Sequence, residues 1–238
     1  MSAEAPKLAI IGAGKMGRAI ASLAAERGWP VVATIARDGN QGGAGINRQA
    51  LRDADVALEF SVASAAPDNI LASTRAGVPI VSGTTGWDAE RERVSVEVRD
   101  SGGALFWAPN FSIGVNLLWQ LAERAGQLVA HSAGFDTHIV ETHHSAKKDA
   151  PSGTAIELGR RVSAALERDV PITSVRTGSV PGTHELIFDA AYEQLTLAHV
   201  ARDRRVFAEG ALAAARWLIG RRGVFTMRDL LQTETGSR

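Results

Sequence analysis

A short basic segment holds two histidines and two lysines, His143, His144, Lys147 and Lys148, and two groups in it can supply protons. It is followed at once by Asp-Ala-Pro-Ser-Gly-Thr, residues 149–154. Pro151 cannot continue a strand, and Ser152 is a favourable N-cap for a helix that would begin at Gly153. Free N–H groups in the first turn of a helix bind anions. The pattern therefore predicts proton donors beside a carboxylate pocket, which suits a substrate with carboxylates and a reducible C=N or C=C bond.

Two simpler explanations of this segment compete with a catalytic one. Paired histidines can bind a metal ion, but no third ligand stands at a familiar spacing and the lysines would repel a cation, so no metal is predicted. A basic run can also be a solvated surface. The predicted helix start argues against that explanation, because a solvated surface does not need a prepared anion site.

A glycine-rich turn near the start of the chain predicts a second site. The stretch IIGAGKMG places Gly12, Gly14 and Gly17 at GxGxxG spacing, directly between a predicted strand and a predicted helix. In dinucleotide-binding folds the first glycine forms the turn, the second lets the backbone approach a pyrophosphate, and the third lets the helix pack on the strand. Such a turn can also serve packing alone. The strand–helix–strand context favours a site for NADPH or NADH.

The segment ATIARDG bears on the choice between these cofactors. It follows the second predicted strand, where dinucleotide folds present an acidic residue to the ribose 2′-hydroxyl or an arginine to a 2′-phosphate. Arg37 favours NADPH. Asp38 next to it keeps NADH possible, and an exposed Arg37–Asp38 ion pair is the alternative explanation.

Two further segments follow predicted strands at the sheet edge where a ligand would bind, SGTTG at 82–86 and APNF at 108–111. Their small side chains and backbone N–H groups could contact a cofactor, although either segment could be an ordinary turn. The predicted cofactor-binding residues are Gly12, Gly14, Lys15, Met16, Gly17, Arg37, Phe60, Gly83, Thr84, Thr85, Ala108, Pro109, Asn110 and Phe111.

The elements that must position these residues fall into two groups. In the first, short β-branched runs alternate with amphipathic segments, as in a parallel sheet covered by helices. Its predicted strands are 7–11, 31–35, 55–60, 78–82 and 104–108, and its predicted helices are 15–28, 67–76 and 88–100. The second group has longer alternating strands, typical of a sheet with one solvated face, at 135–144, 183–190 and 193–201. Two helices accompany them, at 115–128 and 153–166.

This organisation predicts two domains. The first, for the dinucleotide, would span 1–111 and be completed by 204–238, where the pattern returns to helix. The second, for the substrate, would span 112–203. Because cofactor and substrate are assigned to different domains, we expect closure about the connections near Phe111 and Arg204 to assemble the site.

The composition limits the classes of function. The 238 residues are 45% hydrophobic, enough for one large domain or two small ones. Basic and acidic residues number 26 each, so no overall field would attract nucleic acid or an anionic membrane. The absence of cysteine excludes disulfides and thiolate chemistry. No apolar run approaches the ~20 residues of a spanning helix, and the first residues lack a signal-peptide pattern, so we expect a cytoplasmic enzyme.

Six stretches of the sequence together resemble one enzyme family. The most specific is ETHHSAKKDAPSGTA, and the others are IGAGKMGRAI, EFSVASAAPDN, SGTTGW, APNFSIGVN and HVARDRRVFAEGALAAARWL. They resemble the 4-hydroxy-tetrahydrodipicolinate reductases, also called dihydrodipicolinate reductases, of bacterial and plant lysine and diaminopimelate synthesis. The resemblance implies an α/β fold, with a Rossmann-type parallel-sheet domain plus a smaller α+β domain with a mixed sheet. It also implies a homotetramer, and hydride transfer from NADPH or NADH to C4 of a cyclic, unsaturated imine dicarboxylate.

Matched residue by residue, the resemblance assigns roles to the predicted site. His143 would be a general acid or base and Lys147 the proton donor. The substrate carboxylates would be held by His144, Ser152, Gly153, Thr154 and a distal arginine, Arg204. Two departures from the family pattern lie in the cofactor site: the glycine turn is one residue shorter than the common G-x-x-G-x-M-G, and Ala36 replaces an acidic residue.

Two other classes of function are also compatible with parts of the chain. Another two-domain oxidoreductase, such as an amino-acid or sugar dehydrogenase, could share the first domain alone, but it would be expected to lack DAPSGTA. A dinucleotide-sensing regulator would have a decayed active site. The intact His143, Lys147 and Ser152 argue against such decay.

Overall fold

A computed structural model describes residues 4–132 and 134–233. The chain divides into two compact units, one formed by residues 1–111 and 207–238 and the other by Ser112–Val206. It returns to the first unit at Phe207, whereas the sequence pattern places that return at Arg204. The binding roles that the sequence assigns to the two domains stay predictions.

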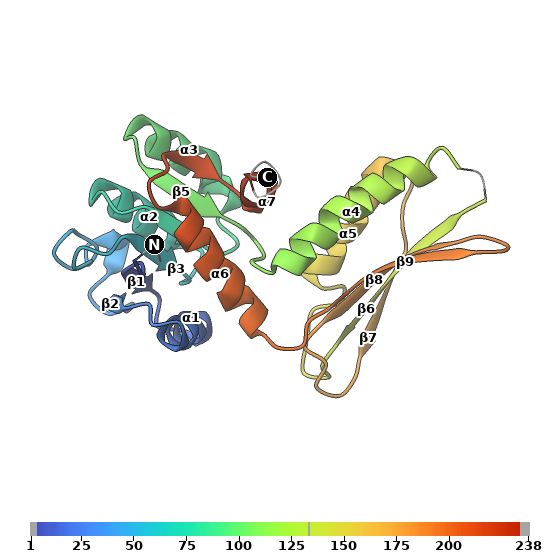
Figure 1. The fold of residues 1–238 in the computed structure, drawn as a ribbon, viewed down its shortest axis with the longest axis horizontal. Coiled ribbons are helices and arrows are strands. Elements are labelled where there is room, and N and C mark those ends of the chain that lie inside the picture. Colours follow the sequence, from blue (N-terminus) through green and yellow to red (C-terminus); the bar gives the residue numbers. More distant parts are fainter. Residues whose placement is uncertain (1–3, 133, 234–238) are drawn as a thin grey trace. The chain divides into compact units, whose positions relative to one another are not determined.

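The first unit is built around six parallel strands in the order β10-β5-β4-β3-β1-β2 (Figure 1). They are β1 (Leu8–Ile11), β2 (Val31–Ile35), β3 (Val56–Glu59), β4 (Ile80–Ser82), β5 (Ala104–Trp107) and β10 (Gly223–Phe225). The five strands predicted before residue 108 are confirmed. β10 is a correction, because the pattern after residue 203 predicts only helix. This strand has three residues and depends on its pairing with β5, which no local pattern reveals.

Helices cover both faces of this sheet. They are α1 (Lys15–Glu26), α2 (Ala66–Arg75), α3 (Asp88–Asp100), α6 (Arg205–Leu218) and α7 (Met227–Thr233), together with a short 3-10 helix, η1 (Gln41–Gly43). α2 and α3 share a buried cluster with Ile11 and Leu105 on one face. On the other face, Gly17 of α1 lies against Ile10. Because parallel strands are buried on both faces, they read as continuous apolar runs such as LAII in β1.

The strand order changes direction between β1 and β3. From β1 the chain passes to β2 on one side and then returns to β3 on the other side of β1. In doubly wound sheets, ligands bind beyond the carboxyl ends of the strands at such a switch point. Gly12 directly follows β1 and Phe60 directly follows β3, so the glycine turn lies at this edge.

The second unit contains a four-stranded mixed sheet in the order β7-β6-β8-β9. Its strands are β6 (Asp136–His143), β7 (Ile172–Arg176), β8 (Thr183–Asp189) and β9 (Gln194–Val200). β6 is parallel to β7 and antiparallel to β8, which confirms the predicted mixed sheet. β7 is a correction: the residues ITSVR are half-buried or exposed, so no buried apolar run marks them as a strand.

One face of this sheet is covered by α4 (Ile113–Val129) and α5 (Gly153–Leu166), as Figure 1 shows. A buried cluster joins these helices to the strands: Leu118, Ile139, Leu158, Leu186 and Phe188. Side chains of β6 alternate between this covered face and the opposite one, as a strand geometry requires. The last two covered positions of β6 are Glu141 and His143. The alternation that builds the core therefore also turns two polar side chains inward.

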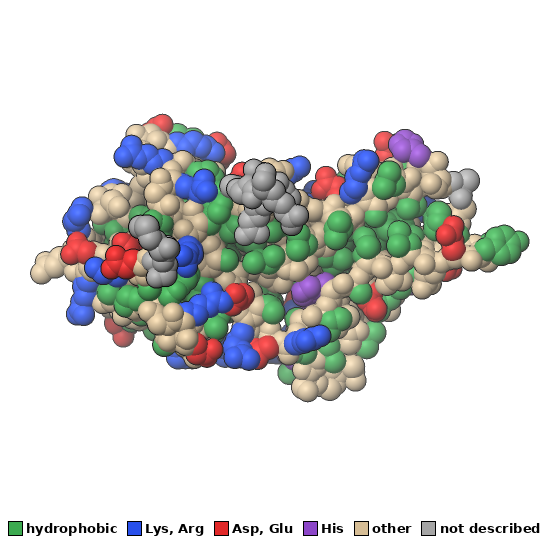
Figure 2. All heavy atoms as spheres, viewed as in Figure 1, with side chains coloured by type: hydrophobic (Ala, Val, Ile, Leu, Met, Phe, Trp, Pro, Cys, Tyr) green, Lys and Arg blue, Asp and Glu red, His purple; other side chains and the backbone are tan. Residues whose placement is uncertain are grey.

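Charged side chains of both signs lie on the surface of the first unit (Figure 2). Figure 2 shows basic and acidic side chains interspersed over the visible face of the first unit. Across the residues that the structure describes, no helix combines the length and the apolar character needed to cross a membrane.

Candidate active site

The basic segment predicted to transfer protons connects β6 to α5. β6 ends at His143, and α5 begins at Gly153 with Ser152 as its N-cap. The Ser152 hydroxyl accepts a hydrogen bond from the N–H of Ala155 at 3.2 Å. No acidic side chain lies in the first turn of α5. The other N–H groups of this turn are therefore suited to bind an anion.

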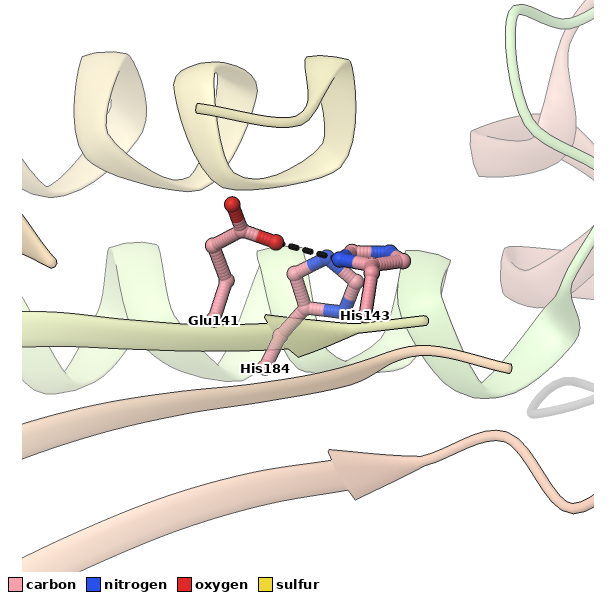
Figure 3. A group of neighbouring side chains, drawn as sticks. All are labelled: Glu141, His143 and His184. Atoms are coloured by element: carbon pink, nitrogen blue, oxygen red, sulfur yellow. Dashed lines mark hydrogen bonds and ion pairs between the residues drawn. The ribbon is translucent and has the colours of Figure 1, made fainter. Parts of the chain in front are cut away.

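Three buried side chains gather beside this turn: Glu141, His143 and His184 (Figure 3). Glu141 and His143 are two residues apart on β6 and so share a face. The register of β8 places His184 directly opposite Glu141. Oε2 of Glu141 is hydrogen-bonded to Nδ1 of His143, and the rings of His143 and His184 lie edge to face with centroids 5.1 Å apart. The pairing of two strands thus creates a polar cluster inside the unit.

Arg176 holds the other oxygen of the Glu141 carboxylate. Its Nη2 donates to Oε1 of Glu141 at 2.6 Å and to the backbone carbonyl of Asp149 at 2.6 Å. Burial alone would raise the pKa of Glu141, but hydrogen bonds from Arg176 and His143 outweigh it and hold the pKa at about 2. Glu141 is therefore an anion at neutral pH.

The ionised Glu141 determines which ring nitrogen of His143 carries the proton. An ionised carboxylate only accepts hydrogen bonds, so Nδ1 of His143 must be the donor. Burial lowers the pKa of His143, and the neighbouring Glu141 opposes this effect without cancelling it. His143 is therefore mainly neutral at pH 7, with the lone pair of Nε2 as the position that can exchange a proton.

His184 connects the cluster to the anion-binding turn. Its Nε2 lies 3.1 Å from the hydroxyl oxygen of Ser152. Burial, with a smaller contribution from His143, lowers the pKa of His184 to about 4. The buried Nδ1 of His184 has no hydrogen-bond partner among the described residues.

The sequence pattern does not directly reveal Glu141, Arg176 or His184 as site residues. The alternation of β6 offers a signal for Glu141, because an acidic side chain on a covered face requires a partner. Arg176 and His184 offer none. They join the cluster only through the register of β7 and β8 with β6, which the sequence does not specify.

Lys147, the predicted proton donor, forms an ion pair with Asp149. Its Nζ lies 2.8 and 2.7 Å from the two carboxylate oxygens. The side chain of Lys147 is 21% exposed and that of Asp149 is 61% exposed. Partly exposed pairs of this kind are weak. A carboxylate of a ligand can therefore compete with Asp149 for the ammonium group.

The cluster also has the spacing of a metal site. One ligand atom from each of Glu141, His143 and His184 lies within 4.8 Å of the others. However, both Glu141 oxygens are already used, by His143 and by the guanidinium of Arg176. A metal ion would have to displace one cation and lie near a second, Lys147. The donor set therefore fits a hydrogen-bonded acid–base group better than a metal ion, and the predicted absence of a metal stays a prediction.

The remaining substrate-binding candidates lie in different surroundings. The backbone carbonyl of half-buried His144 accepts a hydrogen bond from the N–H of Lys147 at 3.0 Å. Gly153 and Thr154 lie in the first turn of α5. Arg204 is exposed, and in the described part of the chain it forms no hydrogen bond or ion pair with that turn. Its role as a distal clamp stays a prediction.

The glycine turn of the first unit has the geometry of a phosphate cradle. Gly12 has φ +105°, and a Cβ there would lie 2.3 Å from the carbonyl oxygen of Phe60. A Cβ at Gly17 would lie 2.0 Å from the carbonyl oxygen of Gly12. These two glycines are required by protein contacts, whereas a Cβ at Gly14 would meet no protein atom within 4 Å. Gly14 is the N-cap of α1 and is followed by a first turn without acidic residues. The open approach at Gly14 fits a pyrophosphate at the helix start.

The structure brings other predicted cofactor residues to the same edge of the sheet. A Cβ at Gly83 would lie 2.0 Å from the ring of Phe60, which explains a glycine directly after β4. The rings of Phe60 and Phe111 are 5.5 Å apart. The segment that holds Ala108, Pro109 and Asn110 leads from β5 to Phe111. These residues therefore follow neighbouring strands, as a dinucleotide site requires.

The residues predicted to choose between cofactors lie at the surface. Lys15 is exposed at the start of α1, and Arg37 is exposed after β2. Within the ranges that the structure describes, Arg37 forms no ion pair with Asp38. The alternative explanation of Arg37, a surface pair with its neighbour, is therefore not what the structure contains.

A doubly wound unit with a dinucleotide cradle, joined to a mixed-sheet unit with an acid–base cluster, defines a two-domain, nicotinamide-dependent oxidoreductase. Residues 6–111 match the family model for the N-terminus of dihydrodipicolinate reductase, and residues 114–231 match the model for its C-terminus. The chain belongs to the dihydrodipicolinate reductase family.

Individual relatives agree with this assignment. The chain is 33% identical to a 4-hydroxy-tetrahydrodipicolinate reductase of Christiangramia forsetii, with 94% of this chain and 97% of the relative covered. It is 38% identical to one of Acidiphilium cryptum, with 92% and 94% covered. A solved dipicolinate-bound dihydrodipicolinate reductase from Paenisporosarcina sp. TG-14 shares the fold, with a TM-score of 0.78 and 22% identity over 94% of this chain and 98% of that one. The match extends over both units, which sets aside a dehydrogenase that shares only the first.

Proposed function

We propose that this protein reduces 4-hydroxy-tetrahydrodipicolinate, which loses water from C4 to give dihydrodipicolinate before the hydride is added, to tetrahydrodipicolinate with NADPH or NADH, in lysine and diaminopimelate biosynthesis. One observation carries the proposal: in a chain of this family, the buried Glu141–His143 pair stands beside a helix start prepared for an anion. A cyclic imine dicarboxylate needs both a proton source and a carboxylate site. A cytoplasmic location stays a prediction from the sequence.

The second unit supplies the binding groups for the substrate. The Ser152–Gly153–Thr154 turn offers N–H groups and hydroxyls to one carboxylate, helped by the positive end of the α5 dipole. His144 and Arg204 extend the pocket to the second carboxylate.

Lys147 and His143 are the residues that transfer protons in the proposed reaction. When a substrate carboxylate competes with Asp149, the Nζ ammonium group is released to approach the ring nitrogen and protonate it as the ring is reduced. A cation there also stabilises the negative charge that develops in the transition state. His143 acts through Nε2 as the acid or base that maintains the protonation of the site, because Glu141 occupies its Nδ1.

The first unit supplies the cofactor site. The nicotinamide ring supplies the hydride. Gly14 and the first turn of α1 face the pyrophosphate, and Phe60, Gly83 and Phe111 line the edge beside it. Hydride transfer requires the bound cofactor and the bound substrate to come into contact with little water between them, so closure of the two units is part of the proposal.

We propose that the protein binds NADPH modestly more tightly than NADH. Ala36 cannot accept a hydrogen bond from a ribose 2′-hydroxyl with its side chain, and it does not repel a 2′-phosphate. Arg37 is exposed and unpaired with Asp38, so its guanidinium is available for a charge-assisted contact. Lys15 adds a positive charge at the same edge. Asp38 reduces the local field, which is why we expect a preference and not exclusion of NADH.

The open face of the second sheet supports the proposed homotetramer. α4 and α5 cover one face. The other carries β-branched and small side chains, Val140, Thr142, Thr173, Val175, Thr183, Ile187, Thr196, Ala198 and Val200, together with the polar Asp136, His138, Glu185, Asp189 and Gln194. A sheet face of this kind is suited to bury itself against a second copy. Light scattering should give a tetrameric mass for the wild type and a smaller mass for Ile187→Lys. The matched change Val96→Lys, at an exposed position of α3, should leave the mass unchanged. A wild-type monomer would contradict the proposal.

The reaction is tested by following the absorbance of the reduced cofactor with pure protein. We expect oxidation of NADPH or NADH only when the cyclic condensation product of aspartate semialdehyde and pyruvate is present. Simple 2-keto acids serve as the control substrates. Turnover of the keto acids without turnover of the cyclic compound would show that the protein is a different dehydrogenase.

A further inference from the structure

A buried carboxylate lies beneath the proposed cofactor site. Glu59 ends β3 and is fully buried. Its Oε1 accepts hydrogen bonds from the N–H of Ser61 at 3.0 Å, from the Ser61 hydroxyl, and from Thr84 Oγ1 at 3.0 Å. Its Oε2 accepts one from the Ser82 hydroxyl at 2.7 Å. In the described ranges it forms no ion pair, so these donors alone compensate its burial. Glu59 thereby ties the segments that follow β3 and β4 to each other.

A directed chain of hydrogen bonds leads from Glu59 to the loop after β2. Nδ2 of Asn69, on α2, donates to the Ser61 hydroxyl at 3.2 Å. Nδ2 of Asn40 donates to Oδ1 of Asn69 at 2.8 Å, and Oδ1 of Asn40 accepts the N–H of Gly45 at 3.1 Å. Each member donates toward Glu59, so the bonds polarise one another in the same direction. Asn69 and Asn40 are both buried.

Asn40 also closes the turn that presents Arg37. Its backbone N–H donates to the carbonyl of Arg37 at 3.2 Å, and Gly39 between them has φ +80°, as the third position of a type II turn requires. The turn is exposed at Arg37 and anchored inside the protein at Asn40. The backbone of this turn is therefore anchored in the protein through the side chain of Asn40.

We infer that Asn40 and Asn69 are specificity-determining residues for the cofactor, because the hydrogen-bond chain from Glu59 positions the Arg37 turn against the ribose 2′-phosphate. The inference rests on the proposed function. Asn40 and Asn69 are positioning residues that act through Arg37. Glu59, at the other end, positions the segments of Ser61 and Thr84, which lie beside the part of the cradle that NADPH and NADH share.

Isosteric substitutions at the two ends of this series of hydrogen bonds should affect the binding of NADPH and NADH differently. Asn40→Asp keeps the acceptor for Gly45 but replaces the donor to Asn69 with a repelling oxygen. The dissociation constant of NADPH should rise about tenfold, as expected for the loss of one charge-assisted contact, and that of NADH should change less than about twofold. Asn69→Asp breaks the next link and should change the ratio in the same direction. Glu59→Gln should weaken both cofactors, because Glu59 also positions the segments beside the part of the cradle that they share.

Ser73→Ala is the matched control. Ser73 is fully buried on α2 in the same unit, and its hydroxyl donates to the carbonyl of Val78 at 3.0 Å, away from the carboxyl ends of the strands. Loss of this bond should lower the melting temperature without changing the ratio of the two dissociation constants. A double-mutant cycle supplies the second readout: in an Arg37→Ala background, Asn40→Asp should no longer change the ratio.

Dissociation constants are measured by titration of each variant with NADPH and with NADH, without substrate. A ratio that shifts toward NADH in Asn40→Asp or Asn69→Asp, and no longer shifts once Arg37 is removed, supports the inference. An unchanged ratio in both variants, or an equal shift in the Arg37→Ala background, overturns it and leaves the proposed function intact. A wild type that binds neither cofactor overturns both.

Discussion

The carboxylate of Glu141 leaves His143 a single nitrogen for chemistry. Oε2 accepts a hydrogen bond from Nδ1 and Oε1 accepts one from Arg176, so proton exchange with a ligand occurs at Nε2. Arg176 also holds the carbonyl of Asp149, the residue whose side chain pairs with Lys147. The guanidinium of Arg176 thus contacts both the carboxylate that orients His143 and the backbone of the residue that pairs with Lys147.

Removal of either group should reduce turnover more than binding. His143→Ala and Lys147→Ala should each lower kcat by roughly 10²-fold or more, the usual scale for a positioned acid or base, while cofactor affinity stays near wild type. Steady-state kinetics and a cofactor titration measure the two effects. Lys148→Ala is the control, because Lys148 is exposed and has no assigned role. Normal kcat in both test variants would mean that the loop is a solvated basic surface.

Arg37 should account for the use of NADPH. A charged hydrogen bond contributes about 1.5–3 kcal/mol, so Arg37→Ala should weaken NADPH binding by roughly ten- to a hundredfold and NADH binding little. The dissociation constants of both cofactors for wild type and variant check this. Equal losses would show that Arg37 does not reach the 2′-phosphate. Tighter binding of NADH by the wild type would reverse the proposed preference.

At the scale of single residues, the sequence predicts the role of a site residue when the residues that support this role are its neighbours along the sequence. His143, Lys147 and Ser152 are recognisable because a proton donor and a helix cap stand within one short segment. Glu141 and Glu59 are not recognisable in this way, because their partners lie on other strands or follow them. Arg176 lies on β7, and Thr84 lies in the segment after β4. Strand register and sheet order decide these contacts.

At the scale of elements, the start of α5 is the centre of the proposed carboxylate site. Thr154→Val removes a hydroxyl and keeps the side-chain shape, and Arg204→Ala removes a charge. Both should raise KM for the substrate and weaken competitive inhibition by pyridine-2,6-dicarboxylate, because a helix start and a guanidinium both favour anions. Inhibition constants for the two variants measure the effect, with exposed Arg202→Ala as the control. If neither variant changes inhibition, the dicarboxylate pocket lies elsewhere.

The elements themselves were largely predictable, and the exceptions share a cause. Apolar runs mark β1 to β5, the alternation of these runs with amphipathic segments marks α1 to α3, and serine N-caps stand before α4 and α5. β7 and β10 lack such signals: none of the β7 side chains is fully buried, and β10 has three residues. Both are strands because a neighbouring strand supplies hydrogen-bond partners, β6 in one case and β5 in the other. Pairing at long range is information that a local pattern does not contain.

At the scale of the whole molecule, the buried cluster should make stability depend on acid pH. The pKa of His184 is about 4 in the folded state against 6.5 when unfolded, so the unfolded state binds more protons between these values. The free energy of unfolding of the second unit should therefore fall by on the order of 3 kcal/mol as the pH drops from 6.5 to 4. Glu141 adds a further loss below pH 4.5, as its folded pKa of about 2 is approached.

Urea unfolding across this pH range measures the effect. His184→Gln removes the titrating group, so its unfolding free energy should vary less between pH 6.5 and pH 4 than that of the wild type. An equal pH dependence in the two proteins would show that His184 is not held neutral by its burial.

The reduction itself is tested most directly by the fate of the transferred hydrogen. The protein is given NADPH deuterated at both C4 positions of the nicotinamide, with the cyclic condensation product as substrate, and the product is examined by NMR. The account predicts deuterium at ring C4 of tetrahydrodipicolinate, at a rate that falls strongly in Lys147→Ala. Oxidation of the cofactor without deuterium at ring C4, or no reduction of the cyclic substrate at all, would contradict it.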